Sequence, residues 1–371
     1  MNLPDNRSGP SEPVRILVLE GDGIGPEIVA STLTVLRRAD ELFRLNLEFE
    51  TADIGFASLA KSGSTFSNDV LAQALEADGI ILGPVSHNDY PPVEKGGLNP
   101  SGELRKRLDL FANIRPARLP RGFEPRCGKP IDLVIVRENT EGFYSDRSMF
   151  QGPGEFMPTP DLAFSIRKVS RESSMRIAES AFEIALRRRR KVTAVHVLRV
   201  SDGLFLECVR SVAQRYPSVA YEERLVDAMT ALLIRDSSMF DVIVTTNMFG
   251  DILSDQAAEI AGSLGLAASL NAGRDHGVAQ AQHGSAPDIA GRGIANPTSL
   301  IASTAMLFDW LAERRDEAPL AQAAAAIRAG LAMALADAEV RTPDLGGRGT
   351  TEGMGRHVAE AVERTGPEGG A

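Results

Sequence analysis

Short apolar runs alternate with longer amphipathic stretches through most of the chain. Five runs contain four or five mainly apolar residues each, at positions 15–19, 79–82, 133–136, 192–195 and 242–245. Runs of this length are typical of strands buried on both faces. Helical periodicity predicts a first helix from about residue 25 to 39 and two closing helices at about 297–314 and 320–340. The pattern predicts an α/β fold with largely parallel strands.

The stretch from about residue 143 to 168 departs from this alternation. It contains five glycines and prolines between Gly152 and Pro160, followed by the near-alternating residues 162–166. Alternation is typical of a strand with one covered face, and an unpaired strand edge can pair with another chain. We therefore expect an arm that pairs with a second copy of the chain.

The composition excludes several classes of protein. Of the 371 residues, 43% are hydrophobic and 24% are charged, as in folded soluble proteins of two domains or one large α/β unit. The 40 basic and 50 acidic residues give a net charge of −10, which repels nucleic acid and anionic lipid. No uncharged apolar run reaches the ~18 residues of a membrane span, and residues 1–14 lack a signal-peptide core. We expect a cytoplasmic protein with no nucleic-acid or membrane partner.

Two local features do not change this expectation. The basic run 187–191 follows a helical pattern, where cations offset the helix dipole, so we favour a structural role over nucleic-acid binding. Cys127 and Cys208 are the only cysteines and form no Cys-x-x-Cys pair, so the sequence offers neither a disulfide framework nor a zinc–thiolate site.

A glycine-rich loop follows the first predicted strand. Gly21, Gly23 and Gly25 precede Pro26 and Glu27. The Rossmann fingerprint needs its third glycine five positions after the first, and here the interval is four. This spacing alone is more typical of a tight turn, so it disfavours an ordinary Rossmann hydroxy-acid dehydrogenase.

Arginines recur in three motif-like blocks. Arg105 lies in Ser-Gly-Glu-Leu-Arg-Lys, Arg115 in Asn-Ile-Arg-Pro, and Arg137 in a block that continues to Tyr144. A guanidinium group binds a carboxylate in a bidentate geometry that lysine cannot provide. A single arginine is more often a surface residue, but three such blocks indicate a site for a small di- or tricarboxylate.

Acidic residues supply candidate metal ligands. Asp251 and Asp255 are four positions apart, so on a helix they share a face and can converge on one cation. Hard carboxylate oxygens favour Mg²⁺ or Mn²⁺ over zinc. The alternative is a helix cap at Asp251 with a solvated Asp255. Asp227 is a further candidate ligand.

The last block runs from His283 to Pro297 and contains the sequence His-Gly-Ser-Ala-Pro-Asp-Ile. Asp288 in this block can accept hydrogen bonds from a ribose diol. The block resembles the coenzyme-adenosine loop of the isocitrate and isopropylmalate dehydrogenase family. If it has that role, a ribose 2′-phosphate would meet a like charge at Asp288, so the resemblance implies NAD rather than NADP.

Together these blocks resemble the isocitrate and isopropylmalate dehydrogenase family, the metal-dependent β-decarboxylating dehydrogenases, over about residues 15–362. The resemblance implies an isopropylmalate-dehydrogenase-like two-domain α/β fold that is not a Rossmann fold. Its coenzyme-binding domain is discontinuous, at 14–110 and 262–371. Residues 111–261 form the substrate, metal and dimerisation domain.

The resemblance also implies roles for individual residues. Tyr144 matches the family's proton donor. Substrate-binding positions are Asn99, Ser101, Arg105, Arg115 and Arg137. Coenzyme-binding positions are His283, Gly284, Ser285, Ala286, Asp288, Ile289 and Asn296. The metal ligands are Asp227, Asp251 and Asp255, with Asp227 reaching into the site of a partner subunit, which implies a homodimer with shared active sites.

The implied reaction is NAD-dependent oxidative decarboxylation of a 2-hydroxy acid that carries a 3-carboxylate, with Mg²⁺ or Mn²⁺. Asn99 and Ser101 stand where the family recognises the third substituent of the substrate, and their polarity favours isocitrate, homoisocitrate or tartrate. Isopropylmalate stays open as an alternative.

Two departures from the family pattern bear on activity. Gln280 stands where the family usually has glutamate, three residues before His283. After His196 the family reads Lys-Ala-Asn, which includes its general base. Here Val197 follows directly, and no lysine occurs after Lys191. A non-catalytic or regulatory member of the family that binds ligand is therefore the alternative interpretation.

Overall fold

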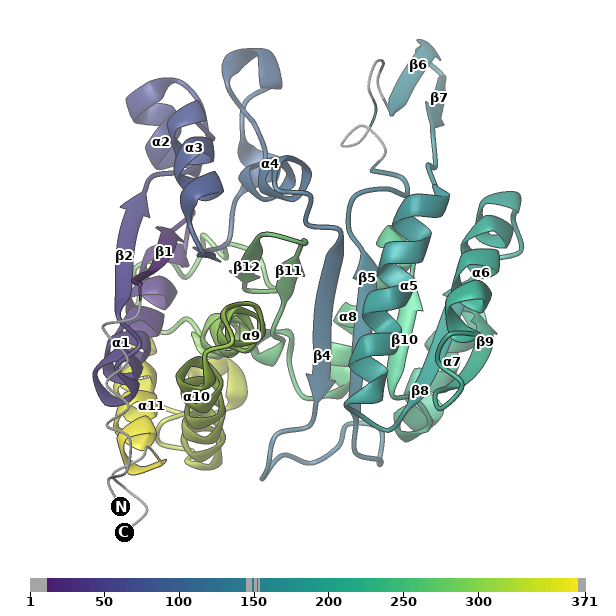
Figure 1. Cartoon of the computed structure of the whole chain (residues 1–371). Coiled ribbons are helices and arrows are strands. Elements are labelled where there is room, and N and C mark those ends of the chain that lie inside the picture. Colours follow the sequence, from purple (N-terminus) through teal and green to yellow (C-terminus); the bar gives the residue numbers. More distant parts are fainter. Residues whose placement is uncertain (1–11, 145–148, 150–151, 153, 366–371) are drawn as a thin grey trace, which may run out of the picture.

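The computed structural model describes residues 12–144, 149, 152 and 154–365, and its central feature is one ten-stranded sheet (Figure 1). The strand order is β2-β1-β3-β12-β11-β4-β5-β10-β8-β9. The strands are β1 (Val14–Leu19), β2 (Leu47–Ala52), β3 (Gly79–Leu82), β4 (Ala112–Arg118), β5 (Asp132–Glu138), β8 (Lys191–His196), β9 (Ala220–Leu225), β10 (Val242–Thr245), β11 (Leu270–Ala272) and β12 (Gly277–Gln280).

Most neighbouring strands in this sheet are parallel. Six of the nine neighbouring pairs are parallel, and the three antiparallel pairs, β12–β11, β11–β4 and β4–β5, are consecutive in the middle of the sheet. The expected α/β fold with largely parallel strands is thereby confirmed. The central reversal is a feature that the apolar runs did not predict.

Helices pack on the sheet and against one another. The α-helices of the described residues are α1 (Gly25–Phe43), α2 (Gly55–Ser62), α3 (Asn68–Glu76), α4 (Pro100–Arg107), α5 (Arg171–Leu186), α6 (Val200–Ala213), α7 (Val226–Asp236), α8 (Asn247–Ile260), α9 (Thr298–Arg315), α10 (Ala318–Ala336) and α11 (Thr351–Thr365). In Figure 1, α1, α9, α10 and α11 gather beside β1 and β12, whereas α5, α6 and α8 lie beside β5, β8 and β10. The two ends of the chain thus build one side of the molecule, and the middle builds the other.

The division into two domains at 14–110 with 262–371 and at 111–261 stays a prediction. The sheet runs through both segments without interruption, because β11 pairs with β4.

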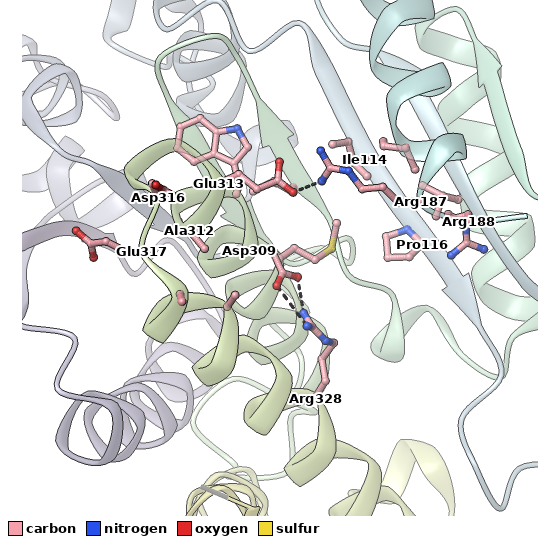
Figure 2. Close-up of a pocket in the computed structure, with 17 residues that line it drawn as sticks. Ile114, Pro116, Arg187, Arg188, Asp309, Ala312, Glu313, Asp316, Glu317 and Arg328 are labelled. Carbon is pink, nitrogen blue, oxygen red and sulfur yellow. Dashed lines mark hydrogen bonds and ion pairs between the residues drawn. The ribbon is translucent and has the colours of Figure 1, made fainter. Parts of the chain in front are cut away.

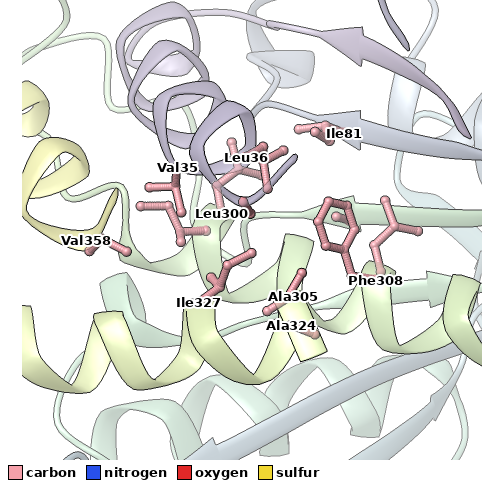
Figure 3. Packing of buried hydrophobic residues seen from close by; sticks show 14 of the residues in the cluster. Val35, Leu36, Ile81, Leu300, Ala305, Phe308, Ala324, Ile327 and Val358 are labelled. Atoms are coloured by element: carbon pink, nitrogen blue, oxygen red, sulfur yellow. The ribbon is translucent and has the colours of Figure 1, made fainter. Parts of the chain in front are cut away.

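The core on the side of the chain ends is made by helix–helix packing. Leu36 of α1, Phe308 of α9, Ile327 of α10 and Val358 of α11 are all inaccessible to solvent and meet in one cluster (Figure 3). Among the described residues, α10 is the one helix long and apolar enough to cross a membrane by length and composition alone, but half of it is buried inside the protein. Its place in this cluster is that of a core helix.

The apolar runs located five strands to within two residues at each end: β1, β3, β5, β8 and β10. The first predicted helix is α1, which extends to Phe43 rather than about residue 39. The two predicted closing helices are α9 and α10, and α10 ends at Ala336 rather than about residue 340. The sequence analysis missed α11, whose apolar residues pack against α1 and α10. It also missed β2 and β9, the two strands at the edges of the sheet, which are only partly buried.

The expected arm contains a hairpin. Strands β6 (Glu155–Thr159) and β7 (Leu162–Ser165) pair antiparallel as a separate two-stranded sheet, and every residue in them is exposed. Phe156 and Phe164 stack with their ring centroids 5.3 Å apart. Residues 145–148, 150–151 and 153 of the expected arm lie outside the described residues. Pairing of the hairpin with a second chain stays a prediction.

The basic run after α5 has structural partners. Arg188 donates to Asp241 Oδ1 at 2.8 Å and to Asp132 Oδ1 at 2.7 Å, and Lys191 pairs with Glu222 at 2.9 Å. These contacts join the start of β8 to β5, β9 and the segment before β10, which supports the structural interpretation of the run.

The close approach of α11 to α1 predicts that Gly355→Ala lowers the stability of the protein. A Cβ atom on Gly355 would lie 2.3 Å from Ser31 Oγ and 2.8 Å from Ser31 O. Gly355→Ala should therefore destabilise the protein by about 1–3 kcal/mol in denaturant titrations, although Gly→Ala in a helix is ordinarily favourable by up to ~1 kcal/mol. The matched control is Gly203→Ala in α6, where nothing lies within 4 Å of the added Cβ, and this change should be neutral or stabilising. Equal effects of the two substitutions would contradict this account of the α1–α11 contact.

Candidate active site

A polar cavity of about 270 Å³ collects most of the residues that the sequence pointed to. They come from separate elements: α4, β4, β5, the segment after β5, α8 and the segment after β12. The predicted residues that line it are Asn99, Ser101, Arg105, Arg115, Arg137, Tyr144, Asp251, His283 and Gly284. Gln280, Gln282 and Ser269 also line it.

The start of α4 presents two of these side chains together. Ser101 and Arg105 are four residues apart and therefore share a face of the helix. Asn99 is the N-cap, and its side-chain oxygen accepts a hydrogen bond from Gly102 N at 3.1 Å. Part of the Asn99 side chain is thus committed to starting the helix, which leaves its amide nitrogen for the cavity.

Arg115 and Arg137 are buried side chains on the adjacent strands β4 and β5, with 7% and 2% of each residue exposed. Arg115 donates to Asn113 Oδ1 at 2.7 Å, to Ser254 Oγ at 2.7 Å and to Asp251 Oδ1 at 3.1 Å. Arg137 donates to Asn247 Oδ1 at 2.7 Å and forms an ion pair with Asp251. Arg137 lies within β5 rather than after it, because the strand continues to Glu138.

The helix α8 approaches these arginines closely because of Gly250. A Cβ at this position would lie 2.6 Å from both Cβ and Cγ of Arg137. The absence of a side chain at position 250 therefore lets Asp251 reach both guanidinium groups, which explains why a glycine precedes the aspartate.

Burial and charge set the ionisation of this cluster. Burial lowers the pKa of Arg115 to about 10, with the neighbouring charge of Arg137 acting in the same direction, so Arg115 remains protonated at neutral pH. Burial opposes ionisation of Asp251, but the charges of Arg137 and Arg115 outweigh it and hold the pKa of that carboxyl below its ordinary value. The cavity therefore carries net positive charge, because Asp251 is the only carboxylate among the described residues that line it.

The three expected metal ligands do not meet within one chain. Asp251 and Asp255 share a face of α8, and both lie near Arg115 Nη1, at 3.1 and 3.5 Å. Asp227 lies in the first turn of α7, exposed and outside the cavity lining. In the part of the chain that the structure describes, no group of three or more His, Cys, Asp or Glu residues is placed to hold a metal. Two carboxylates still fit Mg²⁺ or Mn²⁺, since Mg²⁺ is commonly held by one or two carboxylates with water and substrate oxygens.

A second cavity of about 270 Å³ adjoins the first and is less polar. His283 and Gly284 line both cavities, which places the two spaces side by side. Of the residues expected at a coenzyme, Ala286, Ile289 and Asn296 line the second cavity as well. Ser285 is buried and Asp288 is exposed, and neither lines it. Burial lowers the pKa of His283, so this imidazole is neutral at physiological pH.

The glycine-rich first loop forms the support of the second cavity. Ile24 lines the cavity and donates its N–H to Ser285 O at 2.9 Å, and a Cβ on Gly23 would lie 2.0 Å from that same oxygen. Glu27 accepts hydrogen bonds from Gly291 N at 3.2 Å and Gly293 N at 3.0 Å. The sequence pattern identified the loop but not the hydrogen bonds by which Glu27 holds residues 291–293, because these partners are more than 260 residues away in the chain.

The connection between His196 and the next helix is short. Strand β8 ends at His196, only residues 197–199 intervene, and α6 begins at Val200. Asp202 is fully buried, accepts a hydrogen bond from Val197 N at 3.3 Å and forms an ion pair with Arg167. Leu198 and Val200 are 78% and 95% exposed. No lysine is among the described residues that line the polar cavity.

A larger cavity of about 770 Å³ lies on the opposite face of β4 (Figure 2). Ile114 and Pro116 line it, whereas Arg115 between them lines the polar cavity, as expected for alternating side chains of a strand. The ion pairs Arg187–Glu313 and Arg328–Asp309 lie at this cavity. None of the predicted site residues lines it.

A concave cavity on which several charged side chains converge is the usual form of a small-molecule binding site. The chain belongs to the isocitrate/isopropylmalate dehydrogenase family, whose sequence profile matches residues 15–358. The expected family resemblance and fold class are thereby confirmed.

Known relatives differ in the substrate that their names give. The chain is 39% identical to a 3-isopropylmalate dehydrogenase of Sulfurisphaera tokodaii over 91% of its length and 96% of that protein. It is 38% identical to a homoisocitrate dehydrogenase of Methanocaldococcus jannaschii over 95% of its length and 98% of that protein. The crystal structure of an isocitrate dehydrogenase from Methylococcus capsulatus matches with a TM-score of 0.82 and 36% identity, covering 94% of this chain and 99% of that one. The relatives are dehydrogenases of one family and leave the substrate of this chain open.

The shared counter-charge at Asp251 generates a stability prediction. Asp251→Asn leaves two buried guanidinium groups facing each other. Breaking a fully buried pair costs about 3–5 kcal/mol, and because the Asp251 side chain is 38% exposed we expect about 1–2 kcal/mol. Since the folded-state pKa of Asp251 is lowered, its contribution is complete above the ordinary aspartate pKa of about 4 and is lost as the pH falls through the lower folded-state value.

Denaturant titrations of both proteins from neutral pH to about pH 3 measure this difference. The control is Asp255→Asn, whose side chain is 53% exposed and which should cost less than about 0.5 kcal/mol. A loss for Asp251→Asn that does not shrink at low pH would show that its charge is not the cause.

Proposed function

We propose that the chain is a metal-dependent dehydrogenase that uses NAD to oxidise and decarboxylate a 2-hydroxy acid carrying a 3-carboxylate. One observation carries this proposal: Arg105, Arg115 and Arg137 converge on a single cavity with Asp251 and Tyr144, and this cavity adjoins a second one at His283. Three guanidinium groups are matched by a small molecule with two or three carboxylates. The adjoining cavity provides room for part of a nicotinamide coenzyme.

Each residue has a distinct part in the proposed reaction. The three arginines bind the carboxylates and hold the reacting carbon atoms in place, which lowers the entropic cost of the reaction. Tyr144 donates the proton to carbon after loss of CO₂. Asp251 and Asp255, with Asp227 supplied by a second copy of the chain, would hold Mg²⁺ or Mn²⁺. Such a cation polarises the carbonyl of the 2-oxo acid.

A homodimer is part of the proposal. Asp227 lies outside the cavity of its own chain, so a second copy is needed to bring it to a metal. The hairpin exposes Phe156, Met157, Leu162 and Phe164, each at 45% or more. Exposed apolar side chains gathered on one element are typical of an interaction surface.

NAD is favoured over NADP by charge. Asp344 lines the second cavity and Asp288 lies in the adjacent exposed loop. A 2′-phosphate would have to approach carboxylates there, whereas a ribose diol can donate hydrogen bonds to them.

A substrate panel tests the function. We expect NAD reduction with Mn²⁺ and a polar hydroxy acid among isocitrate, homoisocitrate, malate and tartrate, because Asn99 and Ser101 line the cavity. Isopropylmalate is the contrasting substrate, and strong, exclusive turnover of it would overturn the substrate proposal.

NAD should bind at least about tenfold more tightly than NADP in calorimetry, since a misplaced phosphate costs at least ~1.4 kcal/mol. Equal or tighter binding of NADP would show that the carboxylates do not face the ribose.

The alternative function is that of a non-catalytic or regulatory family member that binds ligand. The observation that favours it is the short connection after His196, together with the lack of lysine among the described cavity residues. Decarboxylation of a supplied 2-oxo acid needs the cation and an acid, whereas oxidation also needs a base for the 2-hydroxyl proton.

Insertion of Lys-Ala-Asn after His196 distinguishes the two functions. The unaltered chain should decarboxylate a supplied 2-oxo acid and oxidise the hydroxy acid slowly. Insertion should then raise the oxidation rate by about 10²–10⁴-fold, the range of general-base assistance. Insertion of Ala-Ala-Asn at the same place is the matched control for loop length. Ordinary dehydrogenase rates in the unaltered chain, with no gain from the insertion, would show that another group supplies the base.

A further inference from the structure

Arg167 connects three elements near the polar cavity and has no part in the reaction proposed above. It follows β7 at the base of the β6–β7 hairpin, and its side chain is 12% exposed. Both terminal nitrogens donate to the carboxylate of Asp202, Nη2 at 3.1 Å, and Nη2 also donates to Thr246 Oγ1 at 3.0 Å. Asp202 lies in the first turn of α6, and Thr246 is the N-cap of α8. The guanidinium group therefore joins the base of the hairpin to both helices.

Two aromatic rings lie beside the same guanidinium group. Arg167 Cζ is 5.9 Å from the ring centre of Phe143 and 5.1 Å from that of Phe249, within the ~6 Å range of cation–π attraction. Phe143 directly precedes Tyr144, and Phe249 lies two residues before Asp251. Tyr144 and Asp251 line the polar cavity, whereas Arg167 does not. Arg167 thus contacts the chain neighbours of two site residues from outside the cavity.

The backbone couples Arg167 to Tyr144 as well. Gly142 N donates to Lys168 O at 2.9 Å and Lys168 N donates to Gly142 O at 2.9 Å, so the two segments form an antiparallel bridge. Lys168 Nζ also pairs with Glu141 at 3.2 Å. Arg167 and Tyr144 are each within two residues of this bridge. An anchor at Arg167 is therefore also an anchor for the backbone of Tyr144.

The ion pair of Arg167 with Asp202 is suited to fixing geometry. Asp202 is fully buried, and it also accepts a hydrogen bond from Val197 N at 3.3 Å. Taking two charges out of water costs about as much as their attraction returns, so a buried pair is weak evidence for stabilisation. A guanidinium fork that meets both oxygens of a carboxylate does, however, restrict orientation strongly. The pair therefore holds the base of the hairpin in one orientation relative to α6.

We propose that Arg167 is a positioning residue that holds Tyr144 in place for proton transfer to carbon. It acts through Phe143 and through the bridge between Gly142 and Lys168. This inference rests on the proposed function, in which the electron pair left on carbon by departing CO₂ takes the proton of the Tyr144 hydroxyl. A C–H bond forms, the O–H bond breaks, and the tyrosinate recovers a proton from solvent. Such a transfer depends steeply on position, since a displacement of about 1 Å can cost ~10²-fold.

Hydrogen exchange at carbon isolates this step. In D₂O with Mg²⁺, the unaltered chain should exchange the hydrogens at carbon 3 of a 2-oxo acid product, because exchange uses the Tyr144 step without the coenzyme or a base for the hydroxyl group. NMR follows the exchange in 2-oxoglutarate, 2-oxoadipate and pyruvate, the products of isocitrate, homoisocitrate and malate.

Arg167→Met should slow this exchange by about 10–100-fold. The Kd of the same 2-oxo acid in calorimetry should change by less than about threefold, because the ion pairs of Asp251 still hold α8 against Arg115 and Arg137. The control is Arg171→Met, which removes an exposed ion pair with Glu207 between α5 and α6 and should leave both measurements unchanged.

A neutral double variant separates positioning from stability. Arg167→Met alone leaves Asp202 buried without its partner and should lower the midpoint of denaturant unfolding. Adding Asp202→Asn removes the second charge and should recover most of that stability, while exchange stays slow. Recovery of exchange together with stability would show a purely structural role and overturn the proposal. If the single variant does not fold, the double variant is compared directly with the unaltered chain.

A double-mutant cycle tests whether Arg167 acts through Tyr144. Tyr144→Phe removes the proton donor, so in that background Arg167→Met should slow the residual exchange by less than about threefold. Losses that multiply in full overturn the inference, and so does unchanged exchange in Arg167→Met, even if the unaltered chain oxidises a hydroxy acid. An unaltered chain that exchanges none of the three acids overturns the inference as well. If it also oxidises no hydroxy acid, the proposed function fails too.

Discussion

The site depends on the burial of two arginines around one carboxylate. Arg115 and Arg137 are inside the protein and like charges repel, so the pair depends on the negative charge of Asp251 on α8, which forms an ion pair with each of them. This constraint requires β4 and β5 to be neighbours, requires α8 to approach β5 without a side chain at Gly250, and requires Asn113, Asn247 and Ser254 to accept the remaining N–H groups. The same arrangement leaves positive charge at a cavity wall, which is what an anionic ligand needs.

Parts of the chain far apart in the sequence share this wall. The antiparallel reversal brings two strands from the C-terminal third, β12 and β11, beside β4 and β5. As a result Gln280 of β12, Asn271 of β11, and Asn113 and Arg115 of β4 form one hydrogen-bonded series across these strands. These hydrogen bonds fix the orientations of the polar side chains at this cavity relative to one another.

The candidate site was predicted in part because its residues occur in compact blocks. Arg105, Arg115, Arg137, Tyr144 and Asp251 could be singled out from their immediate neighbours, and the structure brings all five to one cavity. Asp227 and Asp288 were singled out in the same way, yet neither is among the described residues that line the polar cavity or the second cavity. Glu27 was noted as part of the glycine-rich loop, but its hydrogen bonds to Gly291 and Gly293 could not be predicted, and Asn271 was not singled out, because the partners of both residues lie in other segments.

The sequence by itself determined the class of fold and the family, since five buried strands appear as short apolar runs and four motif blocks stand in order along the chain. The order of the strands, the packing of α11 and the antiparallel centre of the sheet were decided only in the tertiary structure. Hydrophobic periodicity reports which face of an element is buried and is silent on which element covers it. The net charge of the cavity likewise depends on the tertiary structure. The sequence shows three arginines and an aspartate, and only the fold brings them to one cavity with net positive charge.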